Sequence, residues 1–148
     1  MSEVSIREAE EADLADILRA YTEAGIDGGR SFTPEEAREH MVRLRVYPSN
    51  RIFAAYLRGA FAGTYALILL DKLAKRGAPE GIVEDVAVLP AFQRHGVGRA
   101  MMEHAREQCR LAGCYKMALS SAVHREGAHR FYESLGFERH GYSFLIRP

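Results

Sequence analysis

The chain has 148 residues, of which 47% are hydrophobic and 27% are charged, enough for one well-packed core and too few for two ordinary domains. We therefore expect one domain over residues 1–148. Twenty acidic residues balance twenty basic residues, so no overall charge favours binding to nucleic acid or to an anionic membrane. The N-terminal sequence lacks the basic and apolar blocks of a signal peptide, and the longest apolar run, residues 65–70, is too short for a bilayer. We expect a cytoplasmic protein.

Hydrophobic periodicity predicts an alternation of strands and helices. In chain order these are a strand over residues 3–7, helices over 11–24 and 31–45, strands over 52–57, 61–70 and 82–89, a helix over 96–112, a strand over 115–122, a helix over 127–134 and a last strand over 142–147. The sequence leaves a further short strand open near residues 137–140. The helix between strands 82–89 and 115–122 implies a right-handed crossover between two parallel strands in an otherwise antiparallel sheet. The fold class is therefore mixed α/β, one mostly antiparallel sheet with helices on both faces.

Local signals fix two helix ends. Thr33 is a predicted N-cap, Pro34 occupies the first helical position, and Glu36 completes a capping box. Gly113 is well placed to end the helix over residues 96–112.

The cysteines and histidines predict no metal site. Cys109 and Cys114 are the only cysteines, and neither has the companions of a structural zinc site. His124 and His129 are too isolated to indicate a metal. We interpret both cysteines as reduced, mostly structural thiols.

A candidate phosphate-binding segment covers residues 93–99, between a strand that stops at Pro90 and the helix that follows. Glycines at a helix start let the backbone approach an anion, where free amides and the helix dipole favour negative charge. Arg94, His95 and Arg99 add donors, although an ordinary tight turn would explain the glycines alone. A P-loop is excluded because Arg99-Ala100 follows the second glycine, and the dinucleotide fingerprint lacks its third glycine.

Two motifs identify a resemblance to a known family. Gln93-x-x-Gly96-x-Gly98, after the strand Val83 to Val88, resembles the acetyl-CoA signature of the GNAT acetyltransferase superfamily. The segment from Ala128 to Phe137 resembles the late family helix A-x-x-F-Y-x-x-x-G-F. The resemblance implies acetyl-CoA as cosubstrate, bound where the parallel strands splay apart. The implied coenzyme-binding residues are Val86, Ala87 and Val88 for pantetheine, Gln93, Arg94, His95, Gly96, Val97, Gly98 and Arg99 for pyrophosphate, and Arg125.

Arg125 departs from the family pattern, because many members have an asparagine there that touches the pantetheine. Its contact could be to coenzyme phosphate, to substrate or only to solvent.

The resemblance also suggests two catalytic residues. An ammonium has no lone pair, so acetyl transfer needs a base, and Glu84 is the candidate, with a salt-bridge partner or solvent-facing residue as the alternative. Strand alternation places Asp85 on the opposite face. Tyr132 falls where the family places its general acid, which donates a proton to the departing thiolate, although core packing is the alternative.

We therefore predict an N-acetyltransferase that acts on a primary amine of a small molecule by direct attack in a ternary complex. Asp27 and Arg30 are candidate acceptor-binding residues in a flexible loop, with a solvated loop as the alternative. An acetyltransferase of protein lysines or N-termini and a non-catalytic acyl-CoA sensor stay open. A homodimer also stays open, because many relatives pair through sheet edges or terminal strands.

Overall fold

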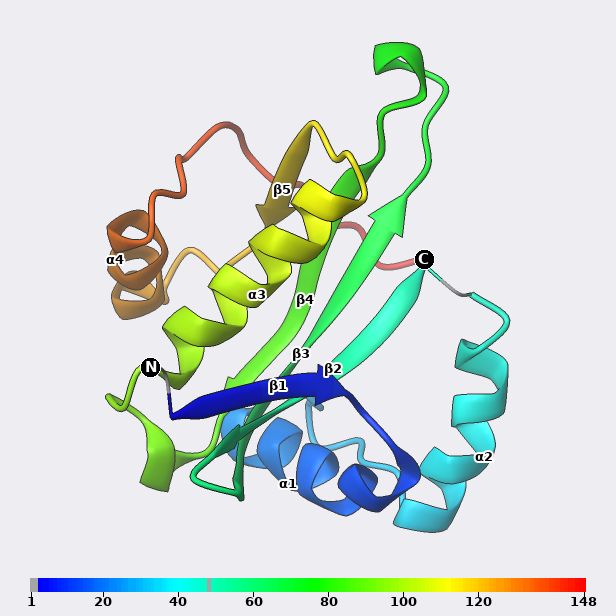
Figure 1. Ribbon diagram of the computed structural model, residues 1–148, viewed down its shortest axis with the longest axis vertical. Helices are drawn as coiled ribbons and strands as arrows, with labels where there is room; N and C mark the ends of the chain where they lie inside the picture. Colours follow the sequence, from blue (N-terminus) through cyan, green and yellow to red (C-terminus); the bar gives the residue numbers. More distant parts are fainter. Residues whose placement is uncertain (1–2, 48) are drawn as a thin grey trace. The chain divides into compact units, whose positions relative to one another are not determined.

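The computed structural model describes residues 3–47 and 49–148 (Figure 1). The chain divides into two compact units, Met1–Ala118 and Leu119–Pro148, and each is described by itself. The expectation of one domain over the whole chain stays a prediction.

The first unit holds most of the regular structure. Its elements are β1 (Val4–Glu8), α1 (Leu14–Ala24), α2 (Pro34–Leu44), β2 (Asn50–Leu57), β3 (Ala60–Leu70), β4 (Glu80–Val88) and α3 (Val97–Leu111), with short 3-10 turns at Glu11–Asp13, Lys75–Gly77 and Pro90–Phe92. Strand β5 (Lys116–Leu119) lies at the boundary between the units and is shorter than predicted. No helix in residues 3–47 and 49–148 is both long and apolar enough to cross a membrane.

The five strands form one sheet in the order β1-β2-β3-β4-β5. The pairs β1/β2, β2/β3 and β3/β4 are antiparallel. Strand β5 runs parallel to β4, as the crossover through α3 predicts (Figure 1). The predicted mixed α/β fold is thereby confirmed.

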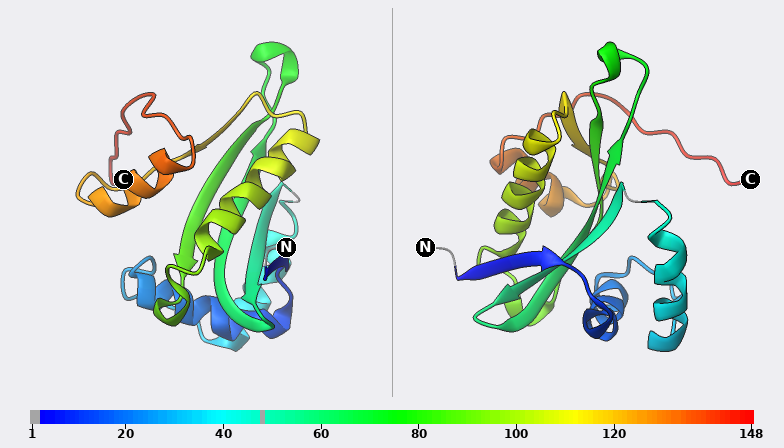
Figure 2. Two further views of the ribbon diagram at one scale, coloured as in Figure 1. Left: turned by 60° about the vertical axis from the view of Figure 1, so that its left-hand side comes forward. Right: turned by 45° about the vertical axis from the view of Figure 1, so that its right-hand side comes forward.

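Helices cover both faces of the first four strands (Figure 2). On one face α3 packs over Phe53 and Tyr65, where the Tyr65 hydroxyl lies 2.7 Å from His104 Nδ1. On the other face α1 contributes Ile17 to a core cluster that contains Ala54 and Ala87. Successive strand residues point to opposite faces, so Phe53 packs in the core beneath α3 and Ala54 packs in the core beneath α1.

Helix α2 begins as its sequence predicts. The Thr33 side chain accepts a hydrogen bond from the Glu36 amide at 3.2 Å, and the Glu36 carboxylate accepts one from the Thr33 amide at 2.8 Å. Pro34 stands at the first position, where its missing N–H leaves no bond unmade. The capping box is confirmed.

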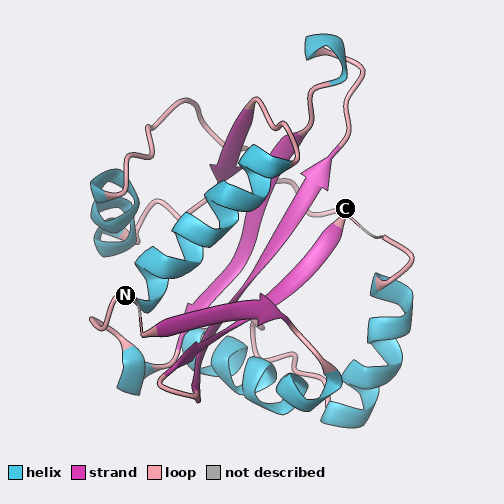
Figure 3. Ribbon diagram, in the orientation of Figure 1, coloured by secondary structure: helices cyan, strands magenta, loops and turns pink. Residues whose placement is uncertain are grey.

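The second unit contains α4 (Glu126–Ser134) and an irregular C-terminal segment. The predicted strand over residues 142–147 is wrong, and residues 137–140 form no strand either (Figure 3). A strand requires a ladder with a neighbouring strand, and no described residue supplies one here. Tyr142, Phe144 and Ile146 are instead 92%, 94% and 90% exposed.

We predict that Gly63→Ala destabilises the protein by about 1–3 kcal/mol, as overpacking does. A Cβ at Gly63 would lie 2.7 Å from the Ala87 carbonyl oxygen, so β3 and β4 would have to move apart. Urea unfolding measures the change. Gly141→Ala is the control, because its Cβ would meet nothing within 4 Å, and equal stability of the two variants would contradict the prediction.

Candidate active site

The central feature of the site is a β-bulge in β4. Ala66 pairs with Glu84 and Thr64 pairs with Ala87, so the single residue Tyr65 opposes both Asp85 and Val86. Asp85 has φ of 51°, a left-handed conformation that non-glycine residues rarely adopt. A bulge interrupts the ladder and leaves its extra residue unpaired, and bulges are frequent beside active sites. The backbone of β4 at Asp85 and Val86 therefore lies outside the regular ladder with β3.

Glu84 and Asp85 are adjacent exposed carboxylates at this bulge. Partial burial raises the pKa of Glu84 above its usual value, and the charge of Asp85 raises it further. Partial burial alone raises the pKa of Asp85. A carboxylate with a raised pKa is a stronger base, so the pair has the chemistry that proton removal from an ammonium requires.

Strict alternation does not hold at Asp85, because the bulge changes the direction of the strand. The charge of Asp85 acts on Tyr21 of α1, whose pKa is raised mainly by burial and further by Asp85. A hydrogen bond with the Thr64 side chain opposes this rise. Thr64 is itself fully buried and donates to the Phe53 carbonyl at 2.8 Å. Tyr21 therefore belongs to the surroundings of the bulge, which the sequence pattern alone did not show.

The predicted phosphate-binding segment precedes α3. Arg94 and Gly96 have φ of 65° and 81°, so the chain turns sharply before the helix. Gly96 is the N-cap and supplies no capping side chain, and the first amides of the helix have no carbonyl partner within it. A Cβ at Gly96 would meet nothing within 4 Å, so the surrounding space is open. The backbone here suits an anion.

The polar side chains of this segment form hydrogen bonds and an ion pair with nearby residues of the chain. Gln93 donates to the Val88 carbonyl at 3.3 Å, which ties the segment to the end of β4. His95 Nδ1 lies 2.8 Å from the Gln93 carbonyl oxygen. Arg99 lies 3.8 Å from Glu103, a long and exposed ion pair that leaves its guanidinium accessible. Val97 is buried in the core, so its side chain is not accessible to a ligand.

Tyr132 and Arg125 lie in the second unit. Tyr132 packs against Phe131 and Phe137, with ring centroids 5.3 and 5.6 Å apart. Burial raises the pKa of Tyr132, and the positive charge of Arg125 partly offsets the rise. The phenol therefore keeps its proton at neutral pH. Arg125 is the N-cap residue of α4, and its side chain is exposed.

Asp27 closes the loop that follows α1. Its carboxylate accepts hydrogen bonds from the Thr22 hydroxyl at 2.6 Å and from the Gly29 amide at 2.9 Å, which lower its pKa. The Arg30 amide donates to the Asp27 carbonyl at 3.0 Å, and the Arg30 side chain is exposed.

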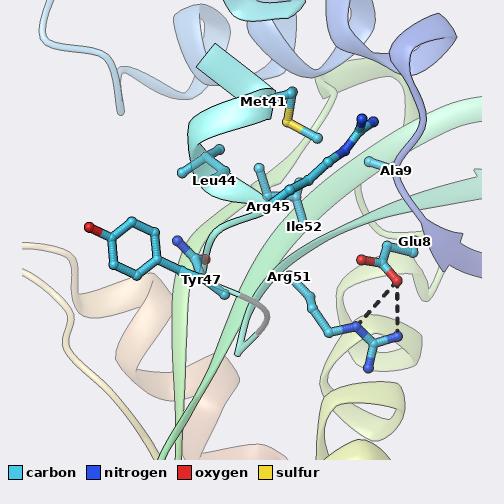
Figure 4. Close-up of a pocket in the computed structure, with 9 residues that line it drawn as sticks. Glu8, Ala9, Met41, Leu44, Arg45, Tyr47, Arg51 and Ile52 are labelled. Carbon is cyan, nitrogen blue, oxygen red and sulfur yellow. Dashed lines mark hydrogen bonds and ion pairs between the residues drawn. The ribbon is translucent and has the colours of Figure 1, made fainter. Parts of the chain in front are cut away.

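A separate pocket lies between α2 and the β1–β2 edge (Figure 4). It has a volume of about 320 Å³, and none of the predicted site residues lines it. Met41, Leu44 and Ile52 form apolar walls, and Arg51 donates to Glu8 at 3.1 Å at the rim. Within the described residues, no three His, Cys, Asp or Glu side chains gather as metal ligands.

The chain is similar in sequence and in structure to known acetyltransferases. A Trypanosoma brucei acetyltransferase structure superposes with a TM-score of 0.84 at 26% identity, covering 98% of this chain and 99% of that one. The glucosamine 6-phosphate N-acetyltransferase of Trypanosoma brucei brucei is 32% identical over 141 residues, 93% of this chain and 91% of the relative. An aminoglycoside N(6')-acetyltransferase from Acinetobacter haemolyticus is 25% identical over 139 residues, 91% of each chain. The fold is that of N-acetyltransferases.

The sequence model of the acetyltransferase (GNAT) family matches residues 13–137. The chain belongs to this family, and the protein is an acyltransferase. The resemblance inferred from the two motifs is confirmed.

We predict that Asp85→Asn lowers the pKa of Glu84 toward its usual value, because it removes the neighbouring negative charge that disfavours ionisation. Asparagine tolerates the left-handed conformation, so the bulge is kept. A ¹³C NMR titration of the Glu84 carboxyl measures the shift. Asp71→Asn, which alters an exposed carboxylate outside the bulge, is the control, and an unchanged Glu84 pKa in Asp85→Asn would refute the assignment.

Proposed function

We propose that the protein transfers the acetyl group of acetyl-CoA to the primary amine of a small molecule, by direct attack in a ternary complex. The observation that carries this proposal is the bulge of β4, which combines unpaired backbone with two carboxylates of raised pKa. Membership of the GNAT family supports acetyl-CoA as the donor.

The coenzyme fits the residues that surround the α3 N-terminus. The amides of residues 94–99 would hold its pyrophosphate, with Arg94 and Arg99 adding positive charge beside the open space at Gly96. The backbone of Val86, Ala87 and Val88 would pair with the pantetheine arm on the side of β4 that faces away from β3, since Ala87 and Val88 already pair with Thr64 and Gly63 on the β3 side. Bound acetyl-CoA supplies an acetyl thioester, the electrophile of the reaction. Arg125 is a further candidate contact.

Glu84 would remove the proton that the acceptor ammonium must lose before it can attack. Burial and the charge of Asp85 raise its pKa, which strengthens it as a base. Tyr132 would donate a hydrogen bond or a proton to the departing thiolate, because burial keeps its phenol protonated. These roles assign the two opposite proton transfers of the reaction to two different side chains.

The acceptor is best sought among amino sugars. The two curated relatives above are named for glucosamine 6-phosphate and for aminoglycosides, and both substrates carry amines on sugar rings. Asp27 and Arg30 are kept as candidate residues of the acceptor loop. The carboxylate of Asp27 would shape this loop through Thr22 and Gly29, and the exposed Arg30 side chain would meet the acceptor.

We predict that Glu84→Gln and Tyr132→Phe each lower kcat/KM by about 10²-fold or more, the usual contribution of general acid–base groups. The measurement is release of free coenzyme A from acetyl-CoA with a panel of amino sugars, aminoglycosides, polyamines and lysine peptides. Glu107→Gln is the control, since this exposed glutamate pairs with exposed Arg110 and is none of the predicted site residues.

Three results would count against the proposal. Unchanged kcat/KM in Glu84→Gln would remove this residue from the base role. Turnover of peptides alone would favour protein acetylation. Acetyl-CoA binding without turnover of any amine would favour a sensor.

We also propose a homodimer formed through the C-terminal segment. Tyr142, Phe144 and Ile146 are at least 90% exposed, and apolar residues gathered in this way mark an interaction site. Their aromatic and β-branched side chains favour strand pairing with a second copy.

We predict that light scattering gives twice the chain mass of 16.6 kDa for the wild type and the single mass for the double variant Phe144→Ser, Ile146→Ser. Both substitutions exchange exposed apolar side chains for small polar ones, so folding of each chain is kept. A monomeric wild type at micromolar concentration would contradict the proposal.

A further inference from the structure

Three lysines surround one tyrosine at the end of the sheet. The ammonium groups of Lys72, Lys75 and Lys116 lie 5.4, 5.8 and 5.7 Å from the centre of the Tyr115 ring. Lys72 and Lys75 belong to the β3–β4 connection, which extends beyond the end of the sheet, and Tyr115 and Lys116 stand at the start of β5 (Figure 1). We refer to these four residues as the Tyr115 cluster.

The Tyr115 cluster carries more positive than negative charge. Glu80 is its one carboxylate among the described residues, at 3.1 Å from Lys72 and 3.5 Å from Lys116. Lys75 forms an ion pair with no carboxylate in residues 3–47 and 49–148. Two ammonium groups therefore share a single carboxylate and the third has none, and an anion would balance this excess of positive charge.

The Tyr115 hydroxyl can take part in anion binding. It accepts a hydrogen bond from Lys72 at 2.9 Å, which leaves its own proton free to donate. Hydrogen bonds to Tyr115 and Glu80 raise the pKa of Lys72, and Lys72 lowers the pKa of Glu80. Both groups are thus charged at neutral pH, and Tyr115 is 37% exposed.

The backbone that presents Lys75 is strained. Lys75, Arg76 and Gly77 have φ of 55°, 56° and 79°, three left-handed residues in succession. Non-glycine residues rarely adopt this conformation, because the Cβ then lies too close to the following carbonyl oxygen. Such strain persists at sites where a particular geometry is used. The ion pairs of Glu80 with Lys72 and Lys116 link the ends of β3, β4 and β5 without Lys75. The stability of the loop alone therefore does not explain why Lys75 lies beside Tyr115.

We propose that the Tyr115 cluster binds an anionic oxygen group, a phosphate or a carboxylate, carried by the amine acceptor. Glu80 and Glu84 are four residues apart on β4, about 13 Å at the usual rise, and side chains at this spacing share a face. Assignment of the anion to the acceptor rests on the proposed function, whereas anion binding by the cluster does not.

The first experiment tests anion binding without catalysis. Inorganic phosphate is titrated into the protein at constant ionic strength, and amide shifts are followed by ¹⁵N NMR. We expect saturable shifts at Tyr115 and Lys116, and an affinity at least threefold weaker in Lys75→Gln. Arg76→Gln is the matched control, because Arg76 has the same left-handed conformation in the same loop and lies outside the cluster.

Two results of this titration would overturn the site. One is the absence of saturable shifts at Tyr115 and Lys116. The other is an equal loss of phosphate affinity in Lys75→Gln and Arg76→Gln, which would indicate nonspecific attraction by the positive charge of the loop. Thermal unfolding of both variants verifies that they fold.

The second experiment tests the source of the anion. KM is compared for a phosphorylated amino sugar and its unphosphorylated counterpart. We expect Lys75→Gln to raise KM about tenfold for the phosphorylated compound and to leave the other unchanged. Equal KM changes for both compounds would overturn assignment of the anion to the acceptor. Absence of turnover with any amine, alongside intact phosphate binding, would count against the proposed function and not against the anion site.

Discussion

The register between β3 and β4 is the constraint on which the site depends. Because Tyr65 opposes both Asp85 and Val86, the two strands cannot pair continuously, and Asp85 is held in a left-handed conformation. This one extra residue breaks the regular ladder between β3 and β4, at the point where the adjacent carboxylates of Glu84 and Asp85 lie. Their raised pKa values follow from partial burial at that point, and for Glu84 also from its neighbour.

Close packing around the bulge holds it in place. At Gly63 there is no room for a Cβ beside the Ala87 carbonyl, and at Gly81 a Cβ would clash with the Cys109 sulfur. The two glycines let β3 approach β4, and β4 approach α3, more closely than any other residue would permit. Helix α3 is fixed against the sheet by the same contacts, so its N-terminus keeps its position near the end of β4.

Local features could be predicted from the sequence, and long-range features could not. The Thr33–Glu36 capping box depends on four consecutive residues, so the local sequence was sufficient to predict the start of α2. The bulge is occupied by an aspartate rather than a glycine, so alternation misled at Asp85. The last strand was predicted wrongly because side-chain pattern does not reveal whether a partner strand is present. Lys72 and Tyr115 lie 43 residues apart, and only the fold brings them together.

Residue-resolved NMR of acetyl-CoA binding tests the central claim most directly, since it reports which backbone amides meet the coenzyme. We expect the largest amide shifts on residues 86–88 and 94–99, at the bulge and at the N-terminus of α3. The contradicting result would be shifts centred on the pocket of Met41, Arg45 and Arg51, with the bulge unaffected.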